Sequence, residues 1–137
     1  MMGSWRETGL ITVPADGPVS WTSREDVALA AALILASDGA YAGPTTLTAS
    51  AAPTFEELAA IASEVTGRTV ERVVVDQAEW VANQVAGGQP EFVARFILCM
   101  HQAAQEGFFA EVDPLLSALV GREPLSVRDL LAQPASH

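Results

Sequence analysis

A run of ten residues, 27–36, contains only Val, Ala, Leu and Ile, and it constrains the fold more than any other part of the sequence. Ser23 is placed to cap a helix over this run, and Asp26, three residues later, can return a hydrogen bond as in a capping box. Asp38 and Gly39 supply a stop, because glycine readily adopts the left-handed conformation at a helix end. A helix that is apolar on every side is expected to be buried on every side, so the rest of the chain should surround it.

The charge of the chain excludes one class of partner. Seventeen acidic and seven basic residues give a net charge of −10 at pH 7, and every basic residue is Arg. Binding of phosphates needs clustered cations, whereas these arginines are spread along the sequence. We therefore expect no binding to nucleic acid, and none to an anionic membrane surface.

Length and hydropathy indicate a water-soluble chain that leaves some apolar surface exposed. The 137 residues suit a single domain, with a strand and helix part (1–75), a helical lobe (76–133) and a short tail (134–137). The run 27–36 is about half of the roughly 20 residues that a membrane span needs. One cysteine, Cys99, permits no internal disulfide, which suits a cytoplasmic protein. A mean hydropathy of +0.26 suggests that apolar surface is left for a second copy or another partner.

The element pattern is α/β. Short segments with strand composition alternate with helical periodicity, and helices follow at the end of the chain. We predict a small partial sheet, a buried central helix and a C-terminal helical lobe. The expected strands are Leu10–Val13, Val19–Trp21, Thr45–Thr48 and Thr69–Val75.

Helix boundaries are marked by capping residues. Thr54 and Glu57 form a capping-box pattern, and Asp76 precedes the next helix, which should stop at the pair Gly87-Gly88. Three more helices are expected to begin at Pro90, at Asp113-Pro114 and at Ser126 with Asp129.

Four segments resemble the C-terminal half of the NmrA-like atypical short-chain dehydrogenase/reductases, a group that includes NAD(P)H quinone and azo-type reductases. They are GLITVPADG with VSW and REDVALAAA (Gly9 to Ala32), LTASAAPTFEELA (Leu47 to Ala59), VTGRTV (Val65 to Val70) and LVGREPLSVRDLL (Leu119 to Leu131). In such proteins the N-terminal Rossmann half binds NAD(P), and the C-terminal half places a small helical lobe over the substrate.

The resemblance implies that this chain lacks the cofactor-binding half. A glycine-rich phosphate loop lies between a strand and a helix, whereas Gly87-Gly88 follows a helix and is interpreted as a stop. The Tyr-x-x-x-Lys pair of typical members cannot exist in a chain without lysine, and Tyr41 lies in an expected loop. We therefore expect no cofactor on this chain alone and no autonomous NAD(P)-dependent reaction.

Few residues are candidates for chemistry, and each has a structural alternative. His101 could act as a general base or pH switch, or be a histidine that is satisfied in the core or lies at its boundary. Asp26 could be a buried carboxylate near a ligand or a helix cap. Cys99 is interpreted as a small packing residue. Arg122 is expected to bind backbone carbonyls or an acid rather than a ligand. No spacing of His, Cys, Asp or Glu suggests a metal site.

Aromatic and apolar side chains suggest a pocket for an apolar small molecule, although core packing would explain most of them equally well. The expected pocket residues are Trp80, Phe96, Met100, Phe108 and Phe109.

Three functions follow as hypotheses. The first is a stand-alone homodimer that binds an apolar small molecule and catalyses a non-redox cyclisation or isomerisation. The second is one subunit of a split NAD(P)-dependent reductase, with a separate complementary Rossmann chain. The third is a non-catalytic interaction module or a fragment. Whether the chain is an enzyme stays open at this point.

Overall fold

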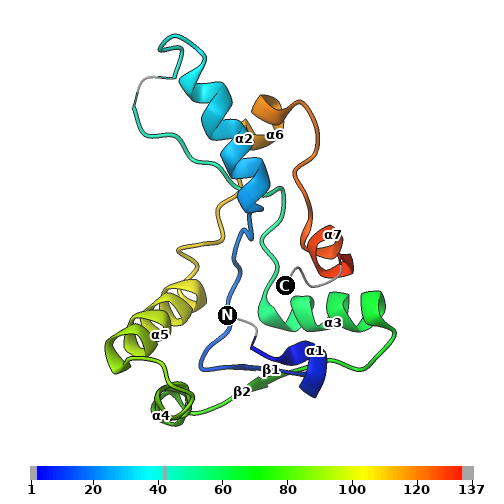
Figure 1. Ribbon diagram of the computed structural model, residues 1–137, viewed down its shortest axis with the longest axis vertical. Helices are drawn as coiled ribbons and strands as arrows, with labels where there is room; N and C mark the ends of the chain where they lie inside the picture. The colour runs from blue at the N-terminus through cyan, green and yellow to red at the C-terminus, as the bar shows by residue number, and fades with distance from the viewer. Residues whose placement is uncertain (1–2, 42, 134–137) are drawn as a thin grey trace. The chain divides into compact units, whose positions relative to one another are not determined.

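A computed structural model describes residues 3–41 and 43–133, and its contacts divide the chain into two compact units, each built from two segments (Figure 1). Unit 1 comprises Met1–Val19 and Pro53–Ala110, and unit 2 comprises Ser20–Ala52 and Glu111–His137. These boundaries differ from the division at residue 75 in the sequence analysis, and a single domain stays a prediction. The expected tail, 134–137, lies outside the described residues.

Unit 1 combines a two-stranded parallel sheet with four helices. The sheet pairs β1 (Leu10–Val13) with β2 (Glu71–Val74), with Leu10 opposite Glu71 and Val13 opposite Val74. The helices are α1 (Trp5–Thr8), α3 (Phe55–Thr66), α4 (Gln77–Ala86) and α5 (Glu91–Gln105). Ile11 and Val13 on one face of β1 are fully buried, whereas Leu10 and Thr12 on the other face are exposed. The predicted α/β class and small sheet are confirmed.

The loop after β1 fixes the position of α3. The Asp16 carboxylate accepts hydrogen bonds from the backbone N–H groups of Phe55 (2.8 Å) and Glu56 (3.1 Å), which are the first two of this helix. It also lies 3.3 Å from the guanidinium of Arg72 on β2. Gly17, the next residue, lies so close to α5 that a Cβ atom there would be 2.1 Å from the carbonyl oxygen of Ala104. One loop therefore joins β1, α3, β2 and α5.

Two predicted strands are wrong. Residues 19–21 and 45–48 have no strand partner, and the strand predicted over 69–75 is shorter, Glu71–Val74. The threonine-rich segment is instead held by a side chain, because the Thr48 hydroxyl accepts a hydrogen bond from the Asp113 N–H (2.7 Å). Strand composition indicates an extended backbone, but a sheet also needs a neighbour of matching register.

Unit 2 contains α2 (Arg24–Leu35), α6 (Leu115–Val120) and α7 (Val127–Ala132), and α2 packs against α6 (Figure 1). The helix forms where the apolar run predicted it. Its burial does not follow the prediction, since only Asp26 and Ala30 of α2 are buried and Leu35 is 85 % exposed. The expectation that this helix is buried on all sides is therefore wrong for this chain alone.

Local capping patterns agree with the sequence. Thr54 with Glu57 and Ser126 with Asp129 form complete capping boxes, and Asp76 accepts hydrogen bonds from the first N–H groups of α4. Ser23 caps α2 by accepting from the Glu25 N–H, and Asp26 takes no part, so the capping box predicted there is wrong. Gly87 ends α4, as predicted for a helix stop.

Candidate functional site

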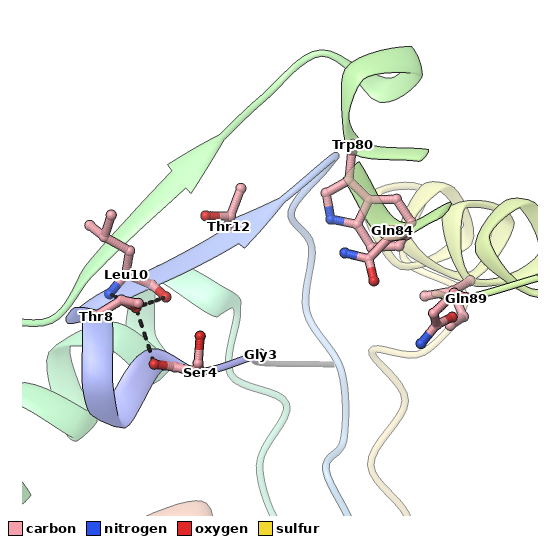
Figure 2. A pocket seen from close by; sticks show the side chains of 9 residues that line it. Gly3, Ser4, Thr8, Leu10, Thr12, Trp80, Gln84 and Gln89 are labelled. Carbon is pink, nitrogen blue, oxygen red and sulfur yellow. Dashed lines mark hydrogen bonds between the residues drawn. The ribbon is translucent and has the colours of Figure 1, made fainter. Parts of the chain in front are cut away.

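A cavity of about 390 Å³ lies in unit 1 against the exposed face of β1 (Figure 2). It combines residues of the N-terminal segment and β1 with residues of α4, the turn that follows α4, and α5. Its lining residues are Gly3, Ser4, Thr8, Leu10, Thr12, Trp80, Gln84, Gln89 and Ile97.

The position of each wall follows from local structure. Strand alternation places Leu10 and Thr12 on the same open face of β1. Trp80 and Gln84 are four residues apart and so lie on one side of α4. The Thr8 hydroxyl accepts a hydrogen bond from the Leu10 N–H (3.1 Å), which fixes the entry into the strand (Figure 2).

The chemistry of the cavity is neutral and offers hydrogen bonds. None of its lining residues is ionisable. In the part of the chain that the structure describes, the side chains of Ser4, Thr12, Gln84 and Gln89 make no hydrogen bond. The Trp80 indole adds a flat apolar wall, and Figure 2 shows its nitrogen directed toward β1. Such a site suits an uncharged ring with one or a few polar groups.

The structure brings one of the five predicted pocket residues to this cavity. Trp80 lines it and is 5 % exposed. Phe96 and Phe108, which are 64 % and 72 % exposed, do not line it, and neither do Met100 and Phe109. Their role in binding a ligand stays a prediction.

Sequence reasoning missed the polar residues of the cavity. Thr12 was considered only as part of a strand, and the two glutamines, Gln84 and Gln89, were not considered. The alternation of β1 and the four-residue spacing from Trp80 were available signals. These two signals do not show that α4 lies against the exposed face of β1, because the placement of the helix depends on tertiary packing.

His101 is buried directly behind Trp80. It is 1 % exposed, and its ring centre lies 5.6 Å from the Trp80 ring and 5.3 Å from the Phe55 ring. Neither ring nitrogen has a hydrogen-bond partner among the described residues. Burial lowers the pKa of this imidazole, since the charged form loses its hydration there. His101 is a core residue rather than a boundary residue, and it does not line the cavity.

The buried imidazole predicts a loss of stability in acid. Because the pKa of His101 is lowered by folding, the unfolded chain binds more protons once the pH falls below the ordinary value near 6.5. The contribution of the neutral imidazole to the free energy of unfolding is therefore fully present above about pH 6.5. It declines as the pH falls below this value, until the pH has passed the lowered pKa of His101 in the folded chain. Between pH 7.5 and pH 5.5 we expect the native chain to lose about 1 kcal/mol more than the H101F variant. Urea unfolding at the two pH values measures this difference, and equal losses in the two proteins would contradict it.

Asp26, the second catalytic candidate, has a structural role in unit 2. Its side chain is fully buried, and one oxygen accepts a hydrogen bond from the Arg122 guanidinium at 2.6 Å. The other accepts from the Leu125 N–H at 2.7 Å. Arg122 also donates to the carbonyl of Glu123, which confirms the expectation that this arginine binds an acid and the backbone. With both oxygens occupied, Asp26 is not available as a general base.

The remaining candidates contribute no site. Cys99 is exposed, so its interpretation as a packing residue is wrong. No group of three or more possible metal ligands occurs over residues 3–41 and 43–133. Within the same ranges, no helix is long and apolar enough to cross a membrane.

The helix N-termini of the described chain do not fit a dinucleotide. A pyrophosphate binds where backbone N–H groups at a helix start are free and no negative charge is close. The Asp16 carboxylate occupies the start of α3, and Asp76 occupies the start of α4. The first turn of α2 contains Glu25 and Asp26, and that of α5 contains Glu91. These carboxylates would repel a phosphate at each of the four longer helices.

No family model matches the sequence. Among curated proteins, the NmrA-like family domain-containing oxidoreductase flvB of Aspergillus flavus is 31% identical over 130 residues, which are 93% of this chain and 42% of that protein. The uncharacterized oxidoreductase YesF of Bacillus subtilis is 27% identical over 131 residues, 96% of this chain and 46% of its own length. The chain is related to the NmrA-like oxidoreductases.

Solved structures give the same relationship. The triphenylmethane reductase of Citrobacter sp., solved in complex with NADP(H), matches with a TM-score of 0.83 and 30% identity over 93% of this chain and 46% of that chain. An NADPH-dependent quinone oxidoreductase from Escherichia coli matches with a TM-score of 0.79 at 24% identity, over 92% of this chain and 46% of that one, and shows the fold alone. The chain thus spans less than half the length of these relatives, in agreement with the expected likeness to their C-terminal half.

Proposed function

We propose that the chain is the substrate-binding half of an NAD(P)H-dependent reductase, and that a dinucleotide-binding half completes the enzyme. The observation that carries this proposal is the likeness to the Citrobacter reductase, at 30% identity and a TM-score of 0.83 over 93% of this chain. The carboxylates at the helix N-termini support it, because they leave binding of the dinucleotide to the other half. No observation on the described residues favours a non-redox cyclase or isomerase.

Within this function, the cavity beside β1 is the proposed substrate site. Trp80, which is 5 % exposed, contributes apolar surface to the lining. Thr12, Gln84 and Gln89 offer hydrogen-bond groups that other side chains do not occupy. A neutral lining avoids the desolvation of a charged group when a flat, largely apolar substrate enters. We expect ring systems such as quinones or triphenylmethane dyes to be accepted.

A chimera tests the function. The part of the Citrobacter reductase that this chain does not match is joined to this chain, and NADPH oxidation is followed with a triphenylmethane dye and with a quinone. We expect turnover by the chimera and none by this chain alone. A chimera that folds and binds NADPH but reduces neither substrate would contradict the proposed function.

A variant of the chimera tests the cavity. Replacing Thr12 with tryptophan fills the space beside Trp80, so kcat/KM should fall at least about tenfold, which corresponds to 1.4 kcal/mol. The matched control is Val73→Trp, because Val73 is paired with Thr12 in the ladder, has its side chain on the same face and does not line the cavity. Equal kcat/KM values for the two variants would remove the cavity from the proposal.

A further inference from the structure

His101 is a buried titratable side chain that does not itself line the proposed substrate site. It is 1 % exposed, and its ring centre lies 5.3 Å from the ring of Phe55 on α3 and 5.6 Å from that of Trp80 on α4. Neither of its nitrogens has a hydrogen-bond partner among the described residues, although buried polar atoms are nearly always paired. A phenyl ring at this place in the core would leave no polar atom unpaired, so packing alone does not account for a histidine.

The same imidazole packs against one wall of the cavity. Trp80 lines the cavity and contacts His101 in an edge-to-face arrangement, with an angle of 68° between the two rings. Ile97, a second lining residue, packs against the buried cluster to which Trp80 belongs. Because protein interiors are closely packed, a movement of His101 is transmitted to the cavity through Trp80.

The surroundings of His101 determine what protonation does. Burial is the strongest influence and lowers the pKa of the imidazole, and the positive amino terminus also lowers it, whereas the Ala15 backbone and the Asp16 carboxylate raise it. The two helices that pack against it present the uncharged rings of Phe55 and Trp80. Asp16 already accepts hydrogen bonds from the first two N–H groups of α3. An imidazolium in this place therefore lacks both water and a carboxylate of its own.

We propose that the neutral imidazole of His101 positions Trp80 in the cavity wall, and that protonation of His101 displaces Trp80 and weakens binding of the substrate. The proposal rests on the proposed function, because that function makes the cavity a substrate site. None of the lining residues is ionisable, so a response to mild acid has to reach the cavity from behind its wall. The device restricts substrate binding to neutral and basic pH.

The direction of the effect follows from linkage. A substrate that binds beside a correctly placed Trp80 prefers the chain with neutral His101, so protonation raises its Kd. The bound substrate must in turn lower the pKa of His101 by the same coupling. We expect the Kd to rise about threefold or more when the pH falls from 7.5 to 5.5.

An NMR titration of the chain tests the coupling without a ligand. The indole N–H signal of Trp80, assigned with Trp80→Phe, and the side-chain amide signal of Gln84 are followed from pH 7.5 to pH 5.5 together with the His101 ring. Both signals should shift with the midpoint of His101, and both should keep their positions in His101→Phe. Signals that stay in place while His101 titrates overturn the proposal, as does an imidazole that stays neutral down to pH 5.5.

A binding measurement tests the effect on the cavity. The probe is menadione, a quinone without an ionisable group, and equilibrium dialysis gives its Kd at pH 7.5 and pH 5.5, with circular dichroism to verify that the chain is folded at both. The native chain should show the threefold rise, and H101F should have the same Kd at both pH values. The matched control is His137→Ala, which removes the other histidine of the sequence and should behave as the native chain does. His101→Gln, which is neutral at every pH, replaces H101F if the phenyl ring prevents folding.

The outcomes separate this coupling from the proposed function. Menadione that binds equally well at both pH values, or whose binding weakens equally in the native chain and in H101F, overturns the proposal and leaves the substrate site in place. If menadione binds at neither pH while the Trp80 and Gln84 signals follow His101, the result contradicts the substrate site and supports the control of Trp80 by His101.

Discussion

Replacing Gly17 with alanine should destabilise unit 1 by about 3 kcal/mol and lower its Tm by about 10 °C. The added Cβ atom would lie 2.1 Å from the carbonyl oxygen and 2.4 Å from the carbonyl carbon of Ala104. Both are backbone atoms of α5, so no side-chain rotation can relieve the overlap. The loop after β1 must move away from α5. This movement weakens the hydrogen bond that the Asp16 carboxylate accepts from the Phe55 N–H at the start of α3.

A second glycine provides the control for this substitution. At Gly87, which ends α4 without a positive φ, an added Cβ atom would lie 3.4 Å from its nearest neighbours, an ordinary van der Waals distance. Gly87→Ala should therefore change the free energy of unfolding by no more than about 0.5 kcal/mol. Thermal unfolding followed by circular dichroism measures both variants. A G17A protein as stable as G87A would show that the loop does not need this close approach.

Replacing Asp26 with alanine should destabilise unit 2 by about 3 kcal/mol, the lower end of the range for breaking a buried ion pair. The fully buried carboxylate holds Arg122 and the Leu125 N–H, and the N–H would be left without its acceptor. The cost stays at the lower end because the Arg122 side chain is 45% exposed and can regain water. Asp26→Asn should cost less than Asp26→Ala, since an amide oxygen can still accept from Leu125.

An exposed ion pair provides the comparison for Asp26. Glu91 and Arg95 are 2.8 Å apart on α5, and both side chains are more than 60% exposed, so Glu91→Ala should cost less than about 0.5 kcal/mol. Urea unfolding of the variants gives the two free energies. Similar values for D26A and E91A would mean that the buried contact does not hold α2 to residues 122–125.

The sequence predicted local features because their partners lie within a few residues. The Thr54 and Glu57 capping box, the Asp76 cap and the Ser126 and Asp129 box all join groups three or fewer residues apart. At so short a separation, the spacing of the residues in the sequence nearly determines the distance between their groups, and each of these caps forms as expected. Trp80, which was predicted as a pocket residue from its chemistry, lines the cavity of unit 1, and its role in binding a ligand stays a prediction.

Contacts between distant residues could not be predicted in the same way. Asp26 has a suitable position for a capping box, yet its carboxylate binds Arg122, 96 residues away. Asp16 lies in the loop after β1, and its carboxylate caps a helix that begins 39 residues later. A carboxylate can satisfy either a local or a distant donor, and only the packed chain decides between them.

The sequence alone determined that residues 24–35 form a helix, since an apolar run with a serine cap favours helix within its own few turns. It also determined the α/β class and the likeness to the NmrA-like oxidoreductases. Only the tertiary structure decided which side of this helix is covered and which segments of strand composition become strands. Burial and strand pairing depend on neighbours that are distant in sequence, and for one face of α2 no such neighbour occurs among the described residues of unit 2.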